Sequence, residues 1–176
     1  CFYIVAGCID NQSPLWLFEV IYRLSRTSRN SLTLQLSGQD LHFSLSGPAA
    51  RQEAVRRVTE LIKSNDLHTR EAVLGQLRKA LPDVSDLEEK AARVMLTWDQ
   101  VREMAEQGMD IGGHTMTHLN LPNAAPEDAW EEISACRRLL EDTIQKPVRH
   151  FSYPNGGNYA YYSEAIKEMV RKAGYR

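Results

Sequence analysis

The chain opens with an apolar run followed by a helical pattern. Residues 2–6 are continuously apolar, aromatic or β-branched and end at Gly7, which predicts a central parallel strand covered on both faces. Residues 10–14 have the composition of a loop. Residues 15–24 carry apolar side chains at helical as well as adjacent spacings, which predicts a largely buried helix.

Apolar and polar residues then alternate over residues 31–46, on either side of a polar stretch at 37–40. This pattern predicts a β-hairpin with one apolar face. His42 falls on the polar face, where we expect it to be exposed.

Helical periodicity returns with two amphipathic stretches. Residues 48–63 begin with a proline and predict one helix, and residues 70–81 predict a second, with His68 in the linker between them. Residues 82–86 indicate a loop. We therefore expect residues 10–95 to form an insertion or lid of mixed structure.

Helices and strands alternate regularly after residue 95. In chain order, the predicted elements are a helix at 98–107 with a Thr97/Gln100 capping box, a strand that stops at Gly112-Gly113, a helix from Pro126 with Trp130, Ile133, Leu140 and Ile144 facing inward, a strand at 148–153, a helix capped by Ser163 and closed by Gly174, and a strand starting at Tyr175. This alternation predicts a parallel α/β sheet or barrel. Chemistry in such folds lies at the C-terminal ends of strands, where GGHTMTH and YPNGG both fall.

The first of these motifs carries two histidines, His114 and His118, with three residues between them. If the backbone after the glycines turns helically, both imidazoles lie on one face and reach one cation. The alternative is a pair of surface histidines with nothing bound. For YPNGG the alternative to a functional role is a tight turn, which proline, asparagine and glycine encode by themselves.

Composition and charge exclude several classes of protein. The 176 residues, 43% hydrophobic and 25% charged, correspond to one ordinary domain. A net charge of −2 gives no basic field for nucleic acid or an anionic membrane, and no apolar run has the length of a membrane span.

Cys1, Cys8 and Cys136 are too few and too far apart for a disulfide framework, so reduced thiols are expected. The chain starts inside a predicted strand and without methionine, so we expect its N-terminus to be missing, which leaves cytoplasm and cell envelope both open.

GGHTMTHLNL followed by RHFSYPNGG, with LTWDQVREMAEQGMDIG leading in, resembles the second and third motifs of the polysaccharide deacetylases, the NodB-homology carbohydrate esterases. The resemblance covers residues 95–176 closely, 1–24 in part and the stretch between them least. It implies a partial, distorted (β/α) barrel over residues 1–176, with a helical and hairpin insertion at about 10–95. The family's first motif, a pair of aspartates, is expected upstream of residue 1.

The resemblance also assigns roles to residues. His114 and His118 match two ligands of a divalent metal, usually zinc, whose third protein ligand is the missing second aspartate, and Thr115 matches the hydroxyl residue that orients the loop. The base is the first aspartate, and the acid is a histidine expected beyond residue 176.

Tyr153, Pro154 and Asn155 match the third motif, where the amide after the proline, here that of Asn155, binds the oxyanion. The family's arginine two residues before the proline is Ser152 here, with Arg149 further up the strand.

The resemblance therefore implies a metal-dependent hydrolase that removes N-acetyl groups, or alternatively O-acetyl groups, from an amino-sugar polysaccharide or oligosaccharide. The segment alone is expected to be inactive, and its oligomeric state is left open. The absence of glutamate after His114 excludes an HExxH zincin, and no HxH pair is present. A catalytically inactive glycan-binding homologue is the alternative from another class.

Overall fold

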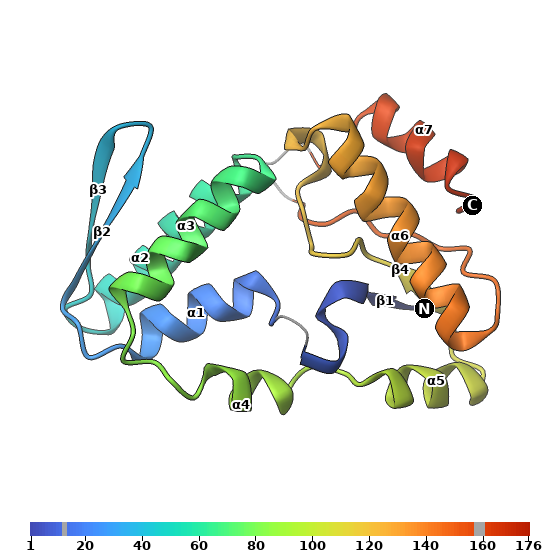
Figure 1. Cartoon of the computed structure of the whole chain (residues 1–176), viewed down its shortest axis with the longest axis horizontal. Helices are drawn as coiled ribbons and strands as arrows, with labels where there is room; N and C mark the ends of the chain where they lie inside the picture. Colours follow the sequence, from blue (N-terminus) through green and yellow to red (C-terminus); the bar gives the residue numbers. More distant parts are fainter. Residues whose placement is uncertain (12–13, 157–160) are drawn as a thin grey trace. The chain divides into compact units, whose positions relative to one another are not determined.

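We describe the protein from a computed structural model, which covers residues 1–11, 14–156 and 161–176. The chain divides into two compact units (Figure 1). Cys1–Ser13 and Val94–Arg176 form the first, and Pro14–Arg93 forms the second. The chain is mixed α/β, and no helix in the described ranges is long and apolar enough to cross a membrane.

The first unit contains a short parallel sheet. Strand β1 (Phe2–Ile4) pairs with β4 (Ile111–Gly113), with Phe2 opposite Ile111 (Figure 1). The strand predicted at 148–153 is reduced to a single parallel bridge between Gly113 and Phe151. The prediction that β1 is covered on both faces was wrong, because Phe2 and Tyr3 are 51% and 45% exposed and only Ile4 is buried.

The two glycines that were expected to end β4 are part of it. A Cβ on Gly112 would lie 2.7 Å from the Tyr3 ring, and one on Gly113 would overlap the hydroxyl of Tyr175. Tyr175 did not start a strand, although the Arg176 amide donates to the Arg149 carbonyl beside the sheet. The glycines therefore let two aromatic rings pack directly on the strand backbone.

Local signals placed the helices of this unit well. The Thr97/Gln100 capping box is formed at α5 (Trp98–Glu106), and the Ser163 hydroxyl caps α7 (Glu164–Lys172). Between them runs α6 (Pro126–Ile144), which contacts β4, α5 and α7. Two 3₁₀ helices, Ala6–Asn11 and Leu121–Asn123, complete the unit. The first occupies part of the expected 10–14 loop, and residues 12–13 lie outside the described ranges.

The core of the first unit lies between the sheet and these helices. Ile133 and Leu140 face it as predicted, and Ile144 is half-buried against it. Trp130 does not face it, since 39% of its surface is exposed. It directly follows the buried Ala129, but the inward face of α6 is set by Ala129, Ile133 and Cys136, and the Trp130 side chain lies beside this face.

The second unit is built from helices and the predicted hairpin. Its elements are α1 (Trp16–Arg26), β2 (Ser31–Leu36), β3 (Gln39–Ser44), α2 (Pro48–Lys63), α3 (Leu67–Ala80) and α4 (Leu87–Ala92). Residues Ser37 and Gly38, both with positive φ, make the two-residue turn. His42 is exposed as expected. His68 lies in the first turn of α3 and not in a linker, because Asp66 caps that helix through the Thr69 amide.

Glu19 and Asp83 each link separate segments of the second unit by hydrogen bonds. Glu19 is 2% exposed and forms ion pairs of 2.7 Å with both Arg23 and Arg78. Burial raises the pKa of Glu19, but the two arginines outweigh burial and the pKa is lowered. Asp83 accepts the Ser28 amide at 2.6 Å, and this bond is the largest cause of a pKa lowered to about 2.

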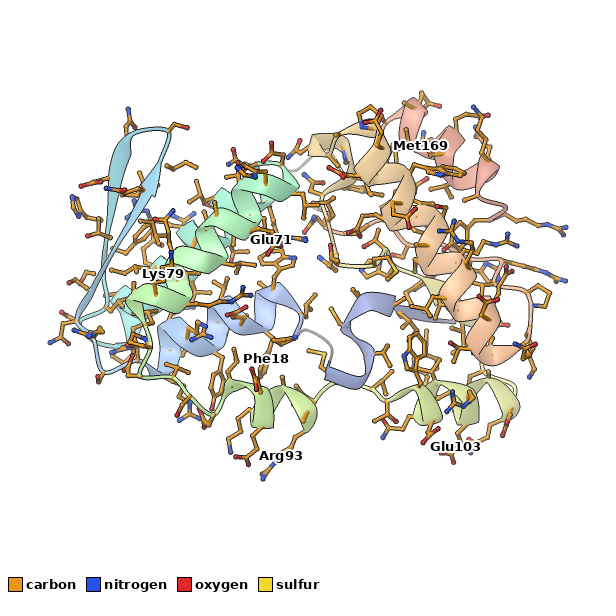
Figure 2. The ribbon with its side chains drawn as sticks, in the orientation of Figure 1. Phe18, Glu71, Lys79, Arg93, Glu103 and Met169 are labelled. Carbon is orange, nitrogen blue, oxygen red and sulfur yellow. The ribbon has the colours of Figure 1, made fainter. Side chains whose placement is uncertain are left out.

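Charged side chains extend from helices of both units into solvent. Arg93, beyond the end of α4, and Glu103 on α5 extend away from the ribbon into solvent (Figure 2).

Candidate active site

The loop after β4 carries His114 and His118 and is not helical. Thr115 and His118 both adopt left-handed conformations, with φ of 66° and 59°. The fully buried Thr115 hydroxyl accepts the His118 amide at 2.9 Å. The expected helical turn was therefore wrong, yet the two imidazoles lie close, with ring centroids 4.9 Å apart and planes at 77°.

Main-chain hydrogen bonds hold this loop against the segment that follows β1. The His114 amide donates to the Ile4 carbonyl at 2.9 Å, and the carbonyls of Thr115 and Met116 accept the amides of Ala6 and Gly7. A Cβ on Gly7 would lie 2.6 Å from the Met116 carbonyl oxygen. Glycine at position 7 therefore permits the close approach that fixes the loop.

His114 is oriented by a carbonyl from the third motif. Its Nδ1 lies 2.8 Å from the Ser152 carbonyl oxygen, which can only accept, so Nδ1 carries the proton and Nε2 presents a lone pair. Burial lowers the pKa of His114, and the bond to Ser152 opposes this only in part. The ring is thus held in the neutral form and the tautomer that bind a metal through Nε2.

The separation of the two imidazole rings is compatible with their sharing one divalent ion. Rings that bind one tetrahedral zinc through Zn–N bonds of about 2.0–2.1 Å have centres about 5 Å apart. The observed separation is 4.9 Å. Among the described residues, no group of three or more His, Cys, Asp or Glu side chains could hold a metal. The donor set in this part of the chain therefore amounts to the two histidines.

The third motif follows the bridge at Phe151. The Phe151 and Tyr153 rings are in edge contact with centroids 5.3 Å apart, and Pro154 is buried. Burial raises the pKa of Tyr153, so its hydroxyl stays protonated at neutral pH. Asn155 has a φ of 69°, and within the described ranges its buried side-chain amide has no hydrogen-bond partner. Buried polar groups without a hydrogen-bond partner are rare in folded proteins.

The structure thus connects the two motifs through the bond from His114 to Ser152, three residues before Asn155. Sequence reasoning missed the role of Ser152, because a main-chain acceptor leaves no signal in residue identity. Arg149 is exposed. The second of the two glycines in the motif, at 157, lies outside the described residues.

Glu132 on α6 was also missed. Its carboxylate is 6% exposed and accepts both the amide and the hydroxyl of Thr117, which lies between the histidines. The available signal was an acidic residue within the apolar face of a predicted helix.

A cysteine nucleophile is not supported at this site. Cys136 lies beneath the sheet, where burial raises the pKa of its thiol to about 11. Cys8 is also buried, Cys1 is exposed, and the three cysteines form no disulfide within the described residues. A thiol with so high a pKa is protonated at neutral pH and unreactive.

Comparison with known proteins gives a consistent picture. The family model for polysaccharide deacetylase matches residues 46–176. Over 81 residues the chain is 31% identical to the Bacillus subtilis protein YxkH, whose name places it with the polysaccharide deacetylases, covering 46% of this chain and 28% of that protein. It is 29% identical to the peptidoglycan-N-acetylglucosamine deacetylase of Bacillus cereus, over 43% of this chain and 33% of the relative.

A longer match is found to the chitooligosaccharide deacetylase of Azorhizobium caulinodans, which is 24% identical over 90% of this chain and 62% of the relative. The chain thus spans between 28% and 62% of the length of these relatives. No solved structure matches. Since the family model covers most of the sequence, the chain belongs to the polysaccharide deacetylase family.

Proposed function

We propose that the protein containing this chain is a metal-dependent hydrolase that removes acetyl groups from an amino-sugar polysaccharide or oligosaccharide. The observation that carries the proposal is the His114/His118 pair, whose rings lie 4.9 Å apart with His114 held as the Nδ1–H tautomer. Two of the relatives are named as deacetylases of peptidoglycan N-acetylglucosamine and of chitooligosaccharide, and these names support an N-acetylated glycan as the substrate.

The two motifs have different proposed roles in the reaction. His114 and His118 would hold a divalent ion such as zinc, together with an aspartate that the family's first motif supplies. When bound, such an ion polarises the acetyl carbonyl and makes a water molecule more acidic. The bond from His114 to the Ser152 carbonyl keeps the ligand nitrogen aimed and unprotonated.

The third motif would stabilise the charge that develops on the acetyl oxygen. In this role the Asn155 main-chain amide donates to the oxyanion, while Pro154 and Tyr153 hold the turn in place. The positive φ of Asn155 supports the role, since it turns the backbone away from the extended path of the preceding residues. We further propose that the parallel β1–β4 pair and the Phe151 bridge belong to a distorted (β/α) barrel.

Acetate release tests the proposal. A protein that carries the whole of this chain is incubated with N-acetylated chitooligosaccharides and zinc, and acetate and free amine are quantified. His114→Ala and His118→Ala should each lose activity and zinc together. His42→Ala, which removes an exposed imidazole from the hairpin, is the matched control and should retain both.

The inactive glycan-binding alternative gives a different result. Glycan binding by the wild type with no acetate released, in the presence of zinc, would contradict the proposed hydrolysis. Equal zinc content in the wild type and the His114→Ala/His118→Ala double variant would contradict the metal site.

A further inference from the structure

Glu132 connects α6 to the histidine loop. Its Oε2 accepts the Thr117 main-chain amide at 2.8 Å, and its Oε1 accepts the Thr117 hydroxyl. The Glu132 side chain is nearly excluded from solvent, with 6% of its surface exposed. Placing a carboxylate in such an environment is costly unless hydrogen bonds compensate it, so these two bonds secure the position of both partners.

The second half of the loop is held by side chains, since the Thr115 hydroxyl accepts the His118 amide and Glu132 binds Thr117. The first half is held by main-chain hydrogen bonds. The His114 amide donates to the Ile4 carbonyl, and the carbonyls of Thr115 and Met116 accept the amides of Ala6 and Gly7. Thr117 comes next, directly before His118, whose left-handed backbone is a conformation that costs energy for a residue other than glycine. A contact that fixes both the main chain and the side chain of Thr117 therefore fixes the direction in which the His118 ring leaves the backbone.

We propose that Glu132 is a positioning residue for His118. It does not touch the metal or the substrate, and acts by anchoring Thr117 to α6 so that the His118 ring stays 4.9 Å from that of His114. This inference rests on the proposed function for the part that concerns metal, but the anchoring of the loop can be measured without it.

The chain offers both a conservative variant and a matched control. Glu132→Ala removes both acceptors. Glu132→Gln keeps both contacts, because its amide oxygen accepts the Thr117 amide and its amide nitrogen donates to the Thr117 hydroxyl. Glu131→Ala removes the neighbouring carboxylate of the same helix, which is 64% exposed and pairs with Arg138.

Zinc affinity is measured by competition with a chromophoric chelator, using a protein that carries the whole of this chain. Glu132→Ala should lower the affinity about 10- to 100-fold, as is usual for residues that orient metal ligands. Glu132→Gln and Glu131→Ala should stay close to the wild type. Urea unfolding without metal separates this effect from a general loss of stability.

The inference is overturned if folded Glu132→Ala binds zinc as tightly as the wild type, or if Glu132→Gln loses as much affinity as Glu132→Ala. Should Glu132→Ala fail to fold, Thr117→Val, which removes only the hydroxyl contact, takes its place and must lower affinity. Amide hydrogen exchange at Thr117 and His118 in the metal-free protein supplies a second readout. Exchange must be faster in Glu132→Ala than in Glu131→Ala, and equal rates would overturn the anchoring even if the wild type bound no zinc.

Discussion

Replacing Gly113 by alanine should destabilise the first unit by forcing a methyl group into Tyr175. The added Cβ would lie 2.9 Å from Cζ and 3.1 Å from Cε1 of that ring, and closer still to its hydroxyl oxygen, whereas ordinary Cβ contacts begin at 3.4 Å. Tyr175 has little freedom to withdraw. It is 4% exposed, its hydroxyl donates to the Ile133 carbonyl, and its ring centroid lies 5.0 Å from that of Phe151.

Overpacking of this kind costs about 1–3 kcal/mol. For a chain of this size each kcal/mol shifts the melting temperature by about 2–4 °C, so Gly113→Ala should melt about 2–12 °C below the wild type. Gly75→Ala is the matched control. Gly75 lies in α3 with no heavy atom within 4 Å of the added Cβ, and alanine there should stabilise by about 0.5–1 kcal/mol.

Circular dichroism during heating and urea unfolding measures both variants. Tyr175→Phe in the Gly113→Ala background removes the nearest atom, so the double variant should be less destabilised than the sum of the single changes by about 0.5 kcal/mol or more. A Gly113→Ala protein that melts with the wild type would refute the packing argument, and strict additivity would refute the assignment of the clash to Tyr175.

Three further outcomes are expected. Thr115→Ala should cost about 1–3 kcal/mol in urea unfolding, because the His118 amide loses the buried hydroxyl that accepts it, whereas Thr115→Ser should cost much less. The pKa of Asp83 is depressed to about 2, so its contribution to stability is present above the unfolded-state pKa near 3.8 and is lost as pH falls toward 2. Asp83→Asn should therefore make the urea midpoint depend less on pH between pH 5 and pH 2, and an unchanged pH dependence would count against the assignment. Glu19→Ala should cost about 3 kcal/mol because it breaks a buried ion-pair group, against under about 1 kcal/mol for the exposed Glu60→Ala, and equal urea midpoints in the two variants would disprove the difference.

Features that depend on neighbouring residues could be predicted from the sequence. The capping box at Thr97 and the cap at Ser163 are each complete within four residues, and both helices begin where expected. The hairpin register also follows from local alternation, with Leu32 opposite Phe43. These signals need no knowledge of the rest of the fold.

Features that depend on distant residues could not be predicted from local pattern. The two histidines have the spacing of a helical turn, but main-chain hydrogen bonds to Ile4, Ala6 and Gly7 hold their loop in a non-helical conformation. The hydroxyl of Thr115 stabilises that conformation by accepting the His118 amide. His114 and His118 lie close together as predicted, but a non-helical loop and not a helical turn brings their rings together. Their role in binding metal stays a prediction.

The bond from His114 to Ser152 has a consequence for how the site tolerates mutation. The acceptor is a main-chain carbonyl, which every amino acid supplies, so the tautomer of His114 is insensitive to the identity of residue 152. Proline would break this arrangement, because the Ser152 amide donates to the Gly113 carbonyl at 2.9 Å. The orientation of the imidazole therefore depends on the course of the backbone at residue 152 and not on the side chain that residue carries.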